Sequence, residues 1–230
     1  TLMNLLCGSF AVVAALMYND LTLAFWLIVA GIVFDFFDGF VARLLHSPSA
    51  IGVQLDSLAD VITSGLAPAA VLWQVCLQTE PCWLPEAWKL GYGVFVLAAF
   101  SALRLAKFNI DETQTVEFCG LPTPAGSLLC ASLGMLWQQG MLALSSDGVL
   151  LIAVLTSLLL VSPIRMFALK FHGFGWRGNE VRYLFLLASI VLIIILRTYA
   201  IPVIIVLYIV VSAVRWLCMH SGNPDKAPKA

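Results

Sequence analysis

Residues 35–60 read DFFDGFVARLLHSPSAIGVQLDSLAD and carry four aspartates, Asp35, Asp38, Asp56 and Asp60, within two otherwise apolar segments. An ionised side chain near the centre of a membrane-spanning helix costs about 2.5–3.5 kcal/mol on the scale derived from insertion experiments. Four such side chains in two neighbouring apolar segments therefore indicate a functional site. Their spacing also predicts how the two segments are arranged.

The spacing of these aspartates suits a pair of antiparallel helices. Asp35 and Asp38 are three residues apart and Asp56 and Asp60 are four apart, so each pair shares one helix face. A tight turn at 47–48 would join the helices. At a rise of 1.5 Å per residue, Asp38 and Asp56 lie about 12–15 Å from this turn, and Asp35 and Asp60 about 18 Å. We therefore expect the four carboxylates to converge.

The composition of the whole chain places these helices in a membrane. Of the 230 residues, 61% are hydrophobic and 11% are charged, and the mean hydropathy is +0.98. Soluble domains are about 45–50% apolar and about 25% charged, which excludes a water-soluble enzyme with an ordinary surface. The net charge of −1 gives no basic excess for nucleic acid. The chain reads as an all-α, polytopic integral membrane helical bundle.

Eight segments have the length and apolarity of membrane spans. A spanning helix needs about 20 mostly apolar residues. The eight candidates are 2–18, 21–46, 50–78, 88–108, 122–144, 148–166, 181–197 and 199–218. We expect one transmembrane domain over residues 1–219, followed by a polar tail over residues 220–230.

The distribution of basic residues predicts the orientation, because cytoplasmic loops carry an excess of Lys and Arg. With both termini in the cytoplasm, two basic residues lie outside, Lys89 and Arg197. Ten then lie on the cytoplasmic side, namely Arg43, Arg104, Lys107, Arg165, Lys170, Arg177, Arg182, Arg215, Lys226 and Lys229. The aspartate site would face the cytoplasm.

Converging carboxylates repel one another unless a cation lies between them. Hard divalent ions prefer oxygen ligands, so Mg²⁺ or Mn²⁺ is the expected cofactor, and four carboxylates are enough for two ions. Two metals about 3.5–4 Å apart commonly clamp phosphoryl groups. Gly39, Ala42 and Gly52 leave room beside the carboxylates, and Arg43 would offer a phosphate partner at the mouth of the site.

Two other interpretations of the four aspartates stay open from the residues alone. A structural polar network is disfavoured by the cost of burying carboxylates in a bilayer. A cation or proton-coupled transporter is the stronger rival, although the chain lacks paired broken helices in two matching halves.

Written with its spacing, the stretch is Asp35-x2-Asp38-Gly39-x2-Ala42-Arg43-x8-Gly52-x3-Asp56-x3-Asp60. This pattern resembles the signature of the CDP-alcohol phosphotransferase family at all eight fixed positions. Other segments resemble the bacterial phosphatidylserine synthase branch of that family. They are TLMNLLCG at 1–8, QLDSLAD at 54–60, GLAP at 65–68, LRLAKFN at 103–109 and GLPTPA at 120–125.

The resemblance implies transfer of a phosphatidyl group from CDP-diacylglycerol to the hydroxyl of L-serine, with release of CMP. It implies that Asp35, Asp38 and Asp56 hold the divalent metals. Asp60 would assist with the metal and act as the general base on serine. Family members are commonly homodimers, and this one would lie in the inner membrane.

The resemblance also assigns the binding residues around the metals. Gly39, Ala42, Arg43 and Gly52 would form the nucleotide and diphosphate site. Asn4, near the cytoplasmic end of the first span, would join it, although a polar residue at a helix start is an equal interpretation.

The choice of acceptor rests on a separate segment. Arg104 and Lys107, with Asn109 just beyond them, would bind the serine carboxylate, or they are ordinary cytoplasmic anchors. A relative with a different acceptor, glycerol 3-phosphate or inositol phosphate, remains an alternative within the family.

Overall fold

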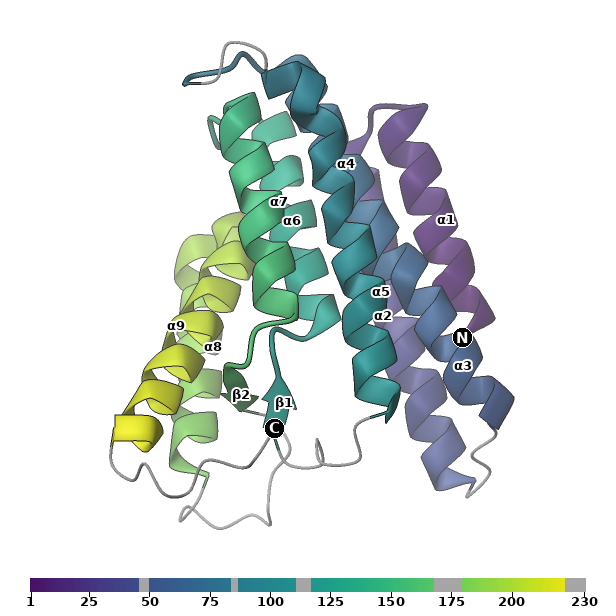
Figure 1. The fold of residues 1–230 in the computed structure, drawn as a ribbon, viewed down its shortest axis with the longest axis vertical. Coiled ribbons are helices and arrows are strands. Elements are labelled where there is room, and N and C mark those ends of the chain that lie inside the picture. The colour runs from purple at the N-terminus through teal and green to yellow at the C-terminus, as the bar shows by residue number, and fades with distance from the viewer. Residues whose placement is uncertain (46–49, 84–86, 111–116, 168–178, 222–230) are drawn as a thin grey trace.

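The structure is a computed structural model, and it describes residues 1–45, 50–83, 87–110, 117–167 and 179–221. Within these ranges the chain is almost entirely helical (Figure 1). The α-helices are α1 (Leu2–Leu16), α2 (Leu21–Leu44), α3 (Ala50–Asp60), α4 (Ala67–Gln78), α5 (Val96–Ile110), α6 (Thr123–Gln138), α7 (Ser146–Leu160), α8 (Glu180–Leu196) and α9 (Ala200–Ser221). The turn predicted at 47–48 lies outside the described residues.

Each predicted span coincides with a helical segment, but several differ in detail. The segment 50–78 is one continuous rod in which a π-helix, Val61–Leu66, joins α3 to α4. The fifth helix begins with a 3₁₀ stretch, Ala87–Phe95. A 3₁₀ turn, Arg197–Tyr199, separates α8 from α9, where Arg197 has a φ of 49°. The prediction of an almost all-α chain is therefore confirmed for the described residues.

Length and composition identify fewer spans than eight. Within the described residues, four segments are long and apolar enough to cross a membrane: Leu21–Ala42, Ile51–Gln78, Leu90–Ile110 and Glu180–Cys218. Helices α1 and α7 are apolar but shorter. The number of crossings therefore stays a prediction.

Helices α1 to α7 form an upright bundle whose core combines many alanines with larger apolar side chains (Figure 1). In a membrane, small side chains let helices approach closely and gain packing contacts. Gly134 of α6 illustrates this, because a Cβ there would lie 2.2 Å from Cγ1 of Val71 on α4. Ala11, Ala14 and Ala15 give α1 a similarly flat buried face.

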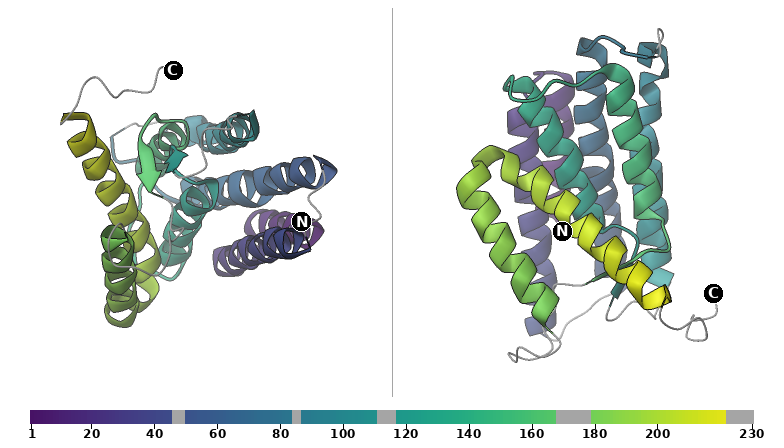
Figure 2. Two further views of the ribbon diagram at one scale, coloured as in Figure 1. Left: turned by 90° about the horizontal axis from the view of Figure 1, so that it is seen from below. Right: turned by 90° about the vertical axis from the view of Figure 1, so that its left-hand side faces the viewer.

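Helices α8 and α9 form a hairpin beside the main bundle (Figure 2). α9 packs on α6 and on a short strand, whereas α8 packs mainly on α9. The hydroxyl of Tyr208 donates to the carbonyl of Phe167 at 2.9 Å, and Phe185 completes this aromatic contact. The attachment of the hairpin therefore runs chiefly through α9.

Two three-residue strands were not predicted from the sequence. β1 (Glu117–Cys119) pairs antiparallel with β2 (Arg165–Phe167) at the end of the bundle that also carries the N-terminus (Figure 1). Gly120 follows β1 with a φ of 77°, and a Cβ there would lie 2.3 Å from the carbonyl oxygen of Leu160. Only glycine fits this close approach without strain.

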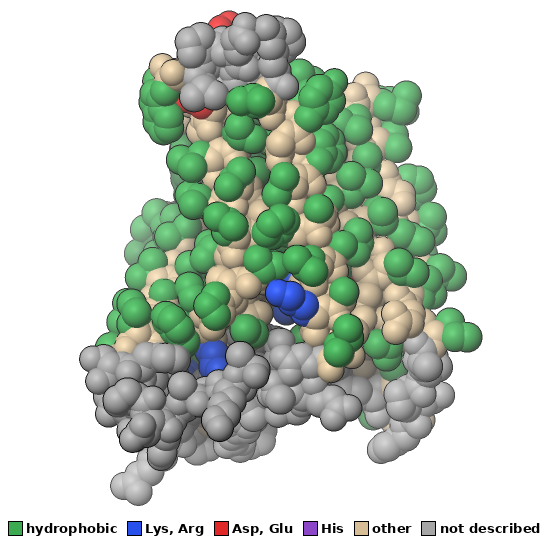
Figure 3. Space-filling view, in the orientation of Figure 1, with side chains coloured by type: hydrophobic (Ala, Val, Ile, Leu, Met, Phe, Trp, Pro, Cys, Tyr) green, Lys and Arg blue, Asp and Glu red, His purple; other side chains and the backbone are tan. Residues whose placement is uncertain are grey.

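The opposite end of the bundle is closed by Asp147 at the start of α7. Its carboxylate accepts hydrogen bonds from the backbone N–H of Cys82 at 3.0 Å and of Trp83 at 2.9 Å. Between the two ends, apolar side chains cover most of the face drawn in Figure 3. The basic side chains visible on that face lie in its lower half, toward the β-strand end.

Candidate active site

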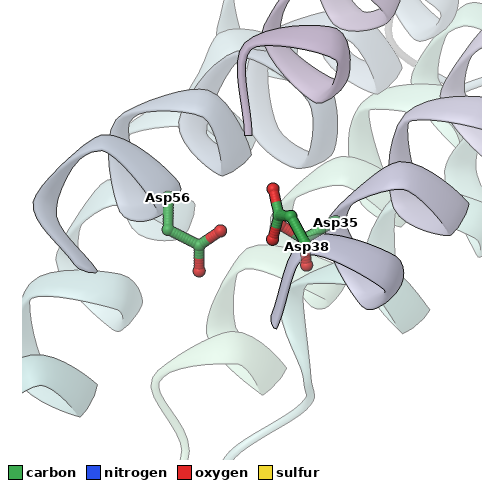
Figure 4. A group of neighbouring side chains, drawn as sticks. All are labelled: Asp35, Asp38 and Asp56. Atoms are coloured by element: carbon green, nitrogen blue, oxygen red, sulfur yellow. The ribbon is translucent and has the colours of Figure 1, made fainter. Parts of the chain in front are cut away.

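Three of the four predicted carboxylates come together at the end of the bundle that carries the N-terminus. Asp35 and Asp38 project from α2, and Asp56 faces them from α3 (Figure 4). One oxygen from each lies within 4.8 Å of the other two. All three side chains are partly buried. The convergence predicted from helix geometry is therefore present for this group.

This donor set fits a hard divalent cation. Carboxylate oxygens are the preferred ligands of Mg²⁺ and Mn²⁺, and Mg²⁺ keeps several water ligands when only a few protein oxygens are available. Partial burial leaves one side open, so water or a phosphate oxygen can complete the coordination.

Asp60 lies beside the three-carboxylate group but is more deeply buried, with 8% of its surface exposed. Its Oδ1 accepts a hydrogen bond at 3.0 Å from the side-chain nitrogen of Asn4 on α1. The same nitrogen donates to Oδ1 of Asp35 at 3.1 Å. Asn4 is fully buried. Through these two hydrogen bonds it links a carboxylate of α2 to a carboxylate of α3.

Asp38 is contacted by Thr1, the residue before α1. Its Oδ2 accepts a hydrogen bond from the Thr1 hydroxyl at 2.7 Å. Thr1 and Asn4 at the start of α1 therefore reach three of the four carboxylates.

The small residues of the signature line the same two helices. Gly39 and Ala42 lie on α2 after the aspartates, and Gly52 lies on α3 before Asp56; all three are partly exposed. Arg43 belongs to α2, but its side chain lies outside the described residues. The backbone thus brings the predicted diphosphate-binding positions next to the carboxylates.

Arg104 of α5 reaches the site from the other side. Its guanidinium is buried, donates to the hydroxyl of Thr123 on α6 at 3.0 Å, and interacts electrostatically with Asp60. It also lies 5.1 Å from the ring centroid of Phe108, within the range of a cation–π contact. A buried cation beside a buried carboxylate partly neutralises the charge of the aspartate group.

Arg104 and Lys107 line a cavity of about 290 Å³ near the short β-sheet. The remaining lining residues are Ile110, Cys119, Leu160, Val161 and Ser162. The cavity combines basic groups with a hydroxyl, which suits a small anionic ligand. Asn109, predicted with this pair, donates instead to the hydroxyl of Ser57 at 2.8 Å and ties α5 to α3.

Sequence reasoning did not single out Thr123, Cys119 or Ser162. Thr123 follows Pro122 at the start of α6 and had a signal, because it falls in the GLPTPA segment that resembles the serine branch. Cys119 and Ser162 are brought to the cavity by the strand pair and the turn after α7, which no local pattern predicts.

Comparisons with known proteins identify relatives of this chain. The family model for CDP-alcohol phosphatidyltransferase matches residues 1–164. A CDP-diacylglycerol–serine O-phosphatidyltransferase of Bacillus subtilis is 33% identical over 173 residues, covering 75% of this chain and 90% of the relative. The enzyme of that name from Helicobacter pylori (strain 26695) is 31% identical over 200 residues, covering 85% and 80%.

The enzyme of that name from Mycobacterium tuberculosis (strain H37Rv) is 34% identical over an alignment that covers 100% of this chain and 82% of the relative. The matched residues 1–164 include α1 to α7 and hold the three-carboxylate group, Asp60 and Arg104. With a model match over most of its length and relatives above 30% identity, the chain belongs to the CDP-alcohol phosphatidyltransferase family.

Proposed function

We propose that this protein transfers the phosphatidyl group of CDP-diacylglycerol to the hydroxyl of L-serine, giving phosphatidylserine and CMP. The observation that carries the proposal is the convergence of Asp35, Asp38 and Asp56 beside the buried Asp60. The names of the relatives from three bacterial genera support serine as the acceptor.

The three-carboxylate group is the proposed metal site, with Mg²⁺ or Mn²⁺ as cofactor and two ions as the expected number. A bound divalent ion would neutralise the diphosphate and stabilise the leaving CMP. The roles of the chain's own residues follow from this placement. Gly39, Ala42, Arg43 and Gly52, with Asn4 behind them, form the proposed nucleotide and diphosphate site.

Asp60 is the proposed general base, assisting also at the metal site. The serine oxygen attacks the phosphorus that bears the diacylglycerol group, and the bond from that phosphorus to the CMP oxygen breaks. Asp60 takes the proton of the serine hydroxyl. A weak nucleophile of this kind needs a positioned base, and Asp60 is the carboxylate that the three-carboxylate group leaves available.

The cavity beside Arg104 and Lys107 is the proposed acceptor site. A guanidinium can bind a carboxylate through two parallel hydrogen bonds, which would fix the serine backbone and aim its hydroxyl at Asp60. The electrostatic interaction of Arg104 with Asp60 supports this arrangement. Asn109 would support the site indirectly through Ser57.

The membrane arrangement completes the proposal. Eight spans, both termini in the cytoplasm and a single domain over residues 1–219 would place the site on the cytoplasmic side of the inner membrane. The lipid tails of the donor would stay in the bilayer while the nucleotide reaches the aspartates from the cytoplasm. A homodimer is the proposed assembly.

The test is an assay on purified protein in nanodiscs that contain CDP-diacylglycerol, with Mg²⁺ or Mn²⁺ present. L-Serine, glycerol 3-phosphate and inositol phosphate are offered separately, and CMP and the lipid product are measured. Serine-dependent CMP and phosphatidylserine support the proposal. CMP with a phosphorylated acceptor alone would refute the choice of acceptor. A lack of CMP with every acceptor would favour the transporter interpretation.

A further inference from the structure

Asn4 occupies a chemically constrained position between two carboxylates. An ionised carboxylate only accepts hydrogen bonds, and the nitrogen of an asparagine side chain offers two donors. Both donors of Asn4 are used, one by Asp35 and one by Asp60. The reverse orientation of the amide would set its oxygen against two carboxylate oxygens, so the chemistry fixes the orientation.

The side-chain oxygen of Asn4 is also informative, because it is buried and has no hydrogen-bond partner among the described residues. Leaving a buried acceptor unpaired is unfavourable. A polar residue that serves only at a helix start can stay exposed to solvent, so the burial of Asn4 indicates a further role. The two hydrogen bonds to Asp35 and Asp60, which are charge-assisted, offset the cost.

Thr63 holds Asn4 from behind. Its hydroxyl donates to the backbone carbonyl of Asn4 at 3.0 Å, and Thr63 is fully buried. A Cβ at Gly8 would lie 2.2 Å from the Thr63 hydroxyl oxygen. A Cβ at Gly31 would lie 2.7 Å from Cγ2 of Thr63 and 3.1 Å from Oδ1 of Asn4. Two glycines thus let α1, α2 and the π-helix close around this pair.

The π-helix explains how Thr63 comes to face α1. Pro68, four residues after Ser64, lacks an N–H and would crowd the carbonyl of that residue in a regular α-helix. The wider turn at Val61–Leu66 accommodates it, and π-helical turns often occur at functional sites. The Ser127 hydroxyl of α6 donates a hydrogen bond to the carbonyl of Thr63 at 3.4 Å.

We propose that Asn4 is a positioning residue that holds the Asp35 and Asp60 carboxylates in a fixed relation, and that Thr63 keeps Asn4 in place. The inference rests on the proposed function, since it links one residue of the metal group to the general base. Asn4 therefore acts on the nucleotide site through these carboxylates.

The experiment compares Asn4→Ala and Asn4→Asp with the wild type and with Ser9→Ala, all purified in nanodiscs. Ser9 is a matched control because it lies on α1 and its hydroxyl donates to the carbonyl of Leu5, one turn earlier on the same helix, at 2.8 Å. Two readouts are used: kcat and KM for serine in the CMP assay, and Mn²⁺ affinity from the electron paramagnetic resonance signal of free Mn²⁺.

For Asn4→Ala we expect kcat to fall about 10–100-fold and Mn²⁺ affinity to weaken by a similar factor, as for partners that orient metal ligands elsewhere. The KM for serine should stay within about twofold, because the acceptor cavity is untouched. Asn4→Asp should lose at least as much, since a further carboxylate replaces the donor. Ser9→Ala should match the wild type.

Asn4→Ala with wild-type kcat and wild-type Mn²⁺ affinity would overturn the inference. If the wild type makes no CMP from serine, the proposed function fails, while the Mn²⁺ titration still tests the role of Asn4. Should the Asn4 variants not fold, Thr63→Val and Thr63→Ser replace them. Thr63→Val should lose activity and Mn²⁺ affinity and Thr63→Ser should retain most of both; equal values for the two would overturn the inference.

Discussion

Arg104 on α5 and Asp60 at the end of α3 are oppositely charged and both buried, so they attract each other inside the bundle. This attraction links the proposed acceptor cavity to the proposed general base. Helix α5 packs along the π-helix that follows Asp60, so the two residues are carried by adjoining backbone. A change at Asp60 should therefore lower kcat, whereas a change at Arg104 should raise the KM for serine.

Asp60→Asn should lower kcat for serine transfer by about 10²–10⁴-fold, because an amide cannot accept the hydroxyl proton. Binding of CDP-diacylglycerol should survive in part, since Asp35, Asp38 and Asp56 remain. Steady-state CMP release and binding of radiolabelled CDP-diacylglycerol measure the two effects. Asp20→Asn is the control, because Asp20 caps α2 at the far end and asparagine caps equally well. Full turnover by Asp60→Asn would remove the general-base role.

Removal of divalent metal should stop the reaction. Without a cation, the three carboxylates repel both one another and the diphosphate of the donor. EDTA should reduce CMP release to background, and excess Mg²⁺ or Mn²⁺ should restore it, whereas EDTA already saturated with Mg²⁺ should have no effect. Activity that persists through exhaustive chelation would contradict the metal site.

Arg104→Gln should raise the KM for serine by about tenfold or more, since a hydrogen bond to a charged group contributes about 1.5–3 kcal/mol and 1.4 kcal/mol is a factor of ten. Lys107→Gln should have a smaller effect, because this side chain is exposed. Arg215→Gln, a basic residue near the end of α9, is the control. If all three variants changed KM equally little, Arg104 and Lys107 would be anchors at the membrane surface.

Gly134→Ala should destabilise the bundle by about 1–3 kcal/mol, the usual range for overpacking. The new methyl group would meet Cγ1 of Val71 at 2.2 Å and push α6 away from α4. Thermal unfolding in detergent measures the loss. The double variant Gly134→Ala/Val71→Ala should recover part of the stability, and a double variant no more stable than Gly134→Ala would argue against this contact.

The pairing of Asp147 with the loop at 82–83 should make stability depend on pH. Partial desolvation raises the pKa of Asp147, but hydrogen bonds from the Cys82 and Trp83 N–H groups and the Ser145 hydroxyl outweigh it, so its pKa lies below the usual range. A lowered carboxyl pKa stabilises the fold above the unfolded value of about 3.9, and the benefit is lost as the pH falls through the folded value.

Asp147→Asn should therefore melt below the wild type at pH 7, and the gap should close as the pH falls below about 4. Glu80→Gln, which removes a charge from the same loop, should melt like the wild type at both values. A constant gap for Asp147→Asn across this range would show that the charge of Asp147 does not stabilise the loop.

The sequence predicted the carboxylate group because a helix has a fixed rise and a fixed face. Counting residues from one turn was enough to match Asp38 and Asp56 in depth, and the structure brings both within 4.8 Å of Asp35 at the ligand oxygens. The same counting could not separate Asp60 from the group. It also could not show that Asn4, more than fifty residues away in the chain, lies against Asp60 and links it to Asp35.

Other parts of the site lay beyond local patterns. Hydrophobic periodicity detects a helical rod over 50–78 but does not distinguish an α-turn from a π-turn within it. The strand pair β1–β2 has three residues per strand and forms only because distant segments meet, so it leaves no alternating signature. The cavity near Arg104 is lined partly by that strand pair. The sequence predicted its basic residues, Arg104 and Lys107, but not the other residues that line it.

The π-helix also changes the directions in which the side chains of the two flanking helices point. A π-turn acts as a single residue added to an α-helix, so the side chains of α4 are rotated about the shared axis relative to those of α3. α3 can thereby turn Asp56 toward α2 while α4 keeps Ala69, Ala70 and Val71 in the core. The α4 half is buried on all sides, because the consecutive residues Ala67 to Leu72 are all buried. The rod thus carries the site residue Asp56 on its α3 half and core packing on its α4 half, and substitutions in one half need not disturb the other.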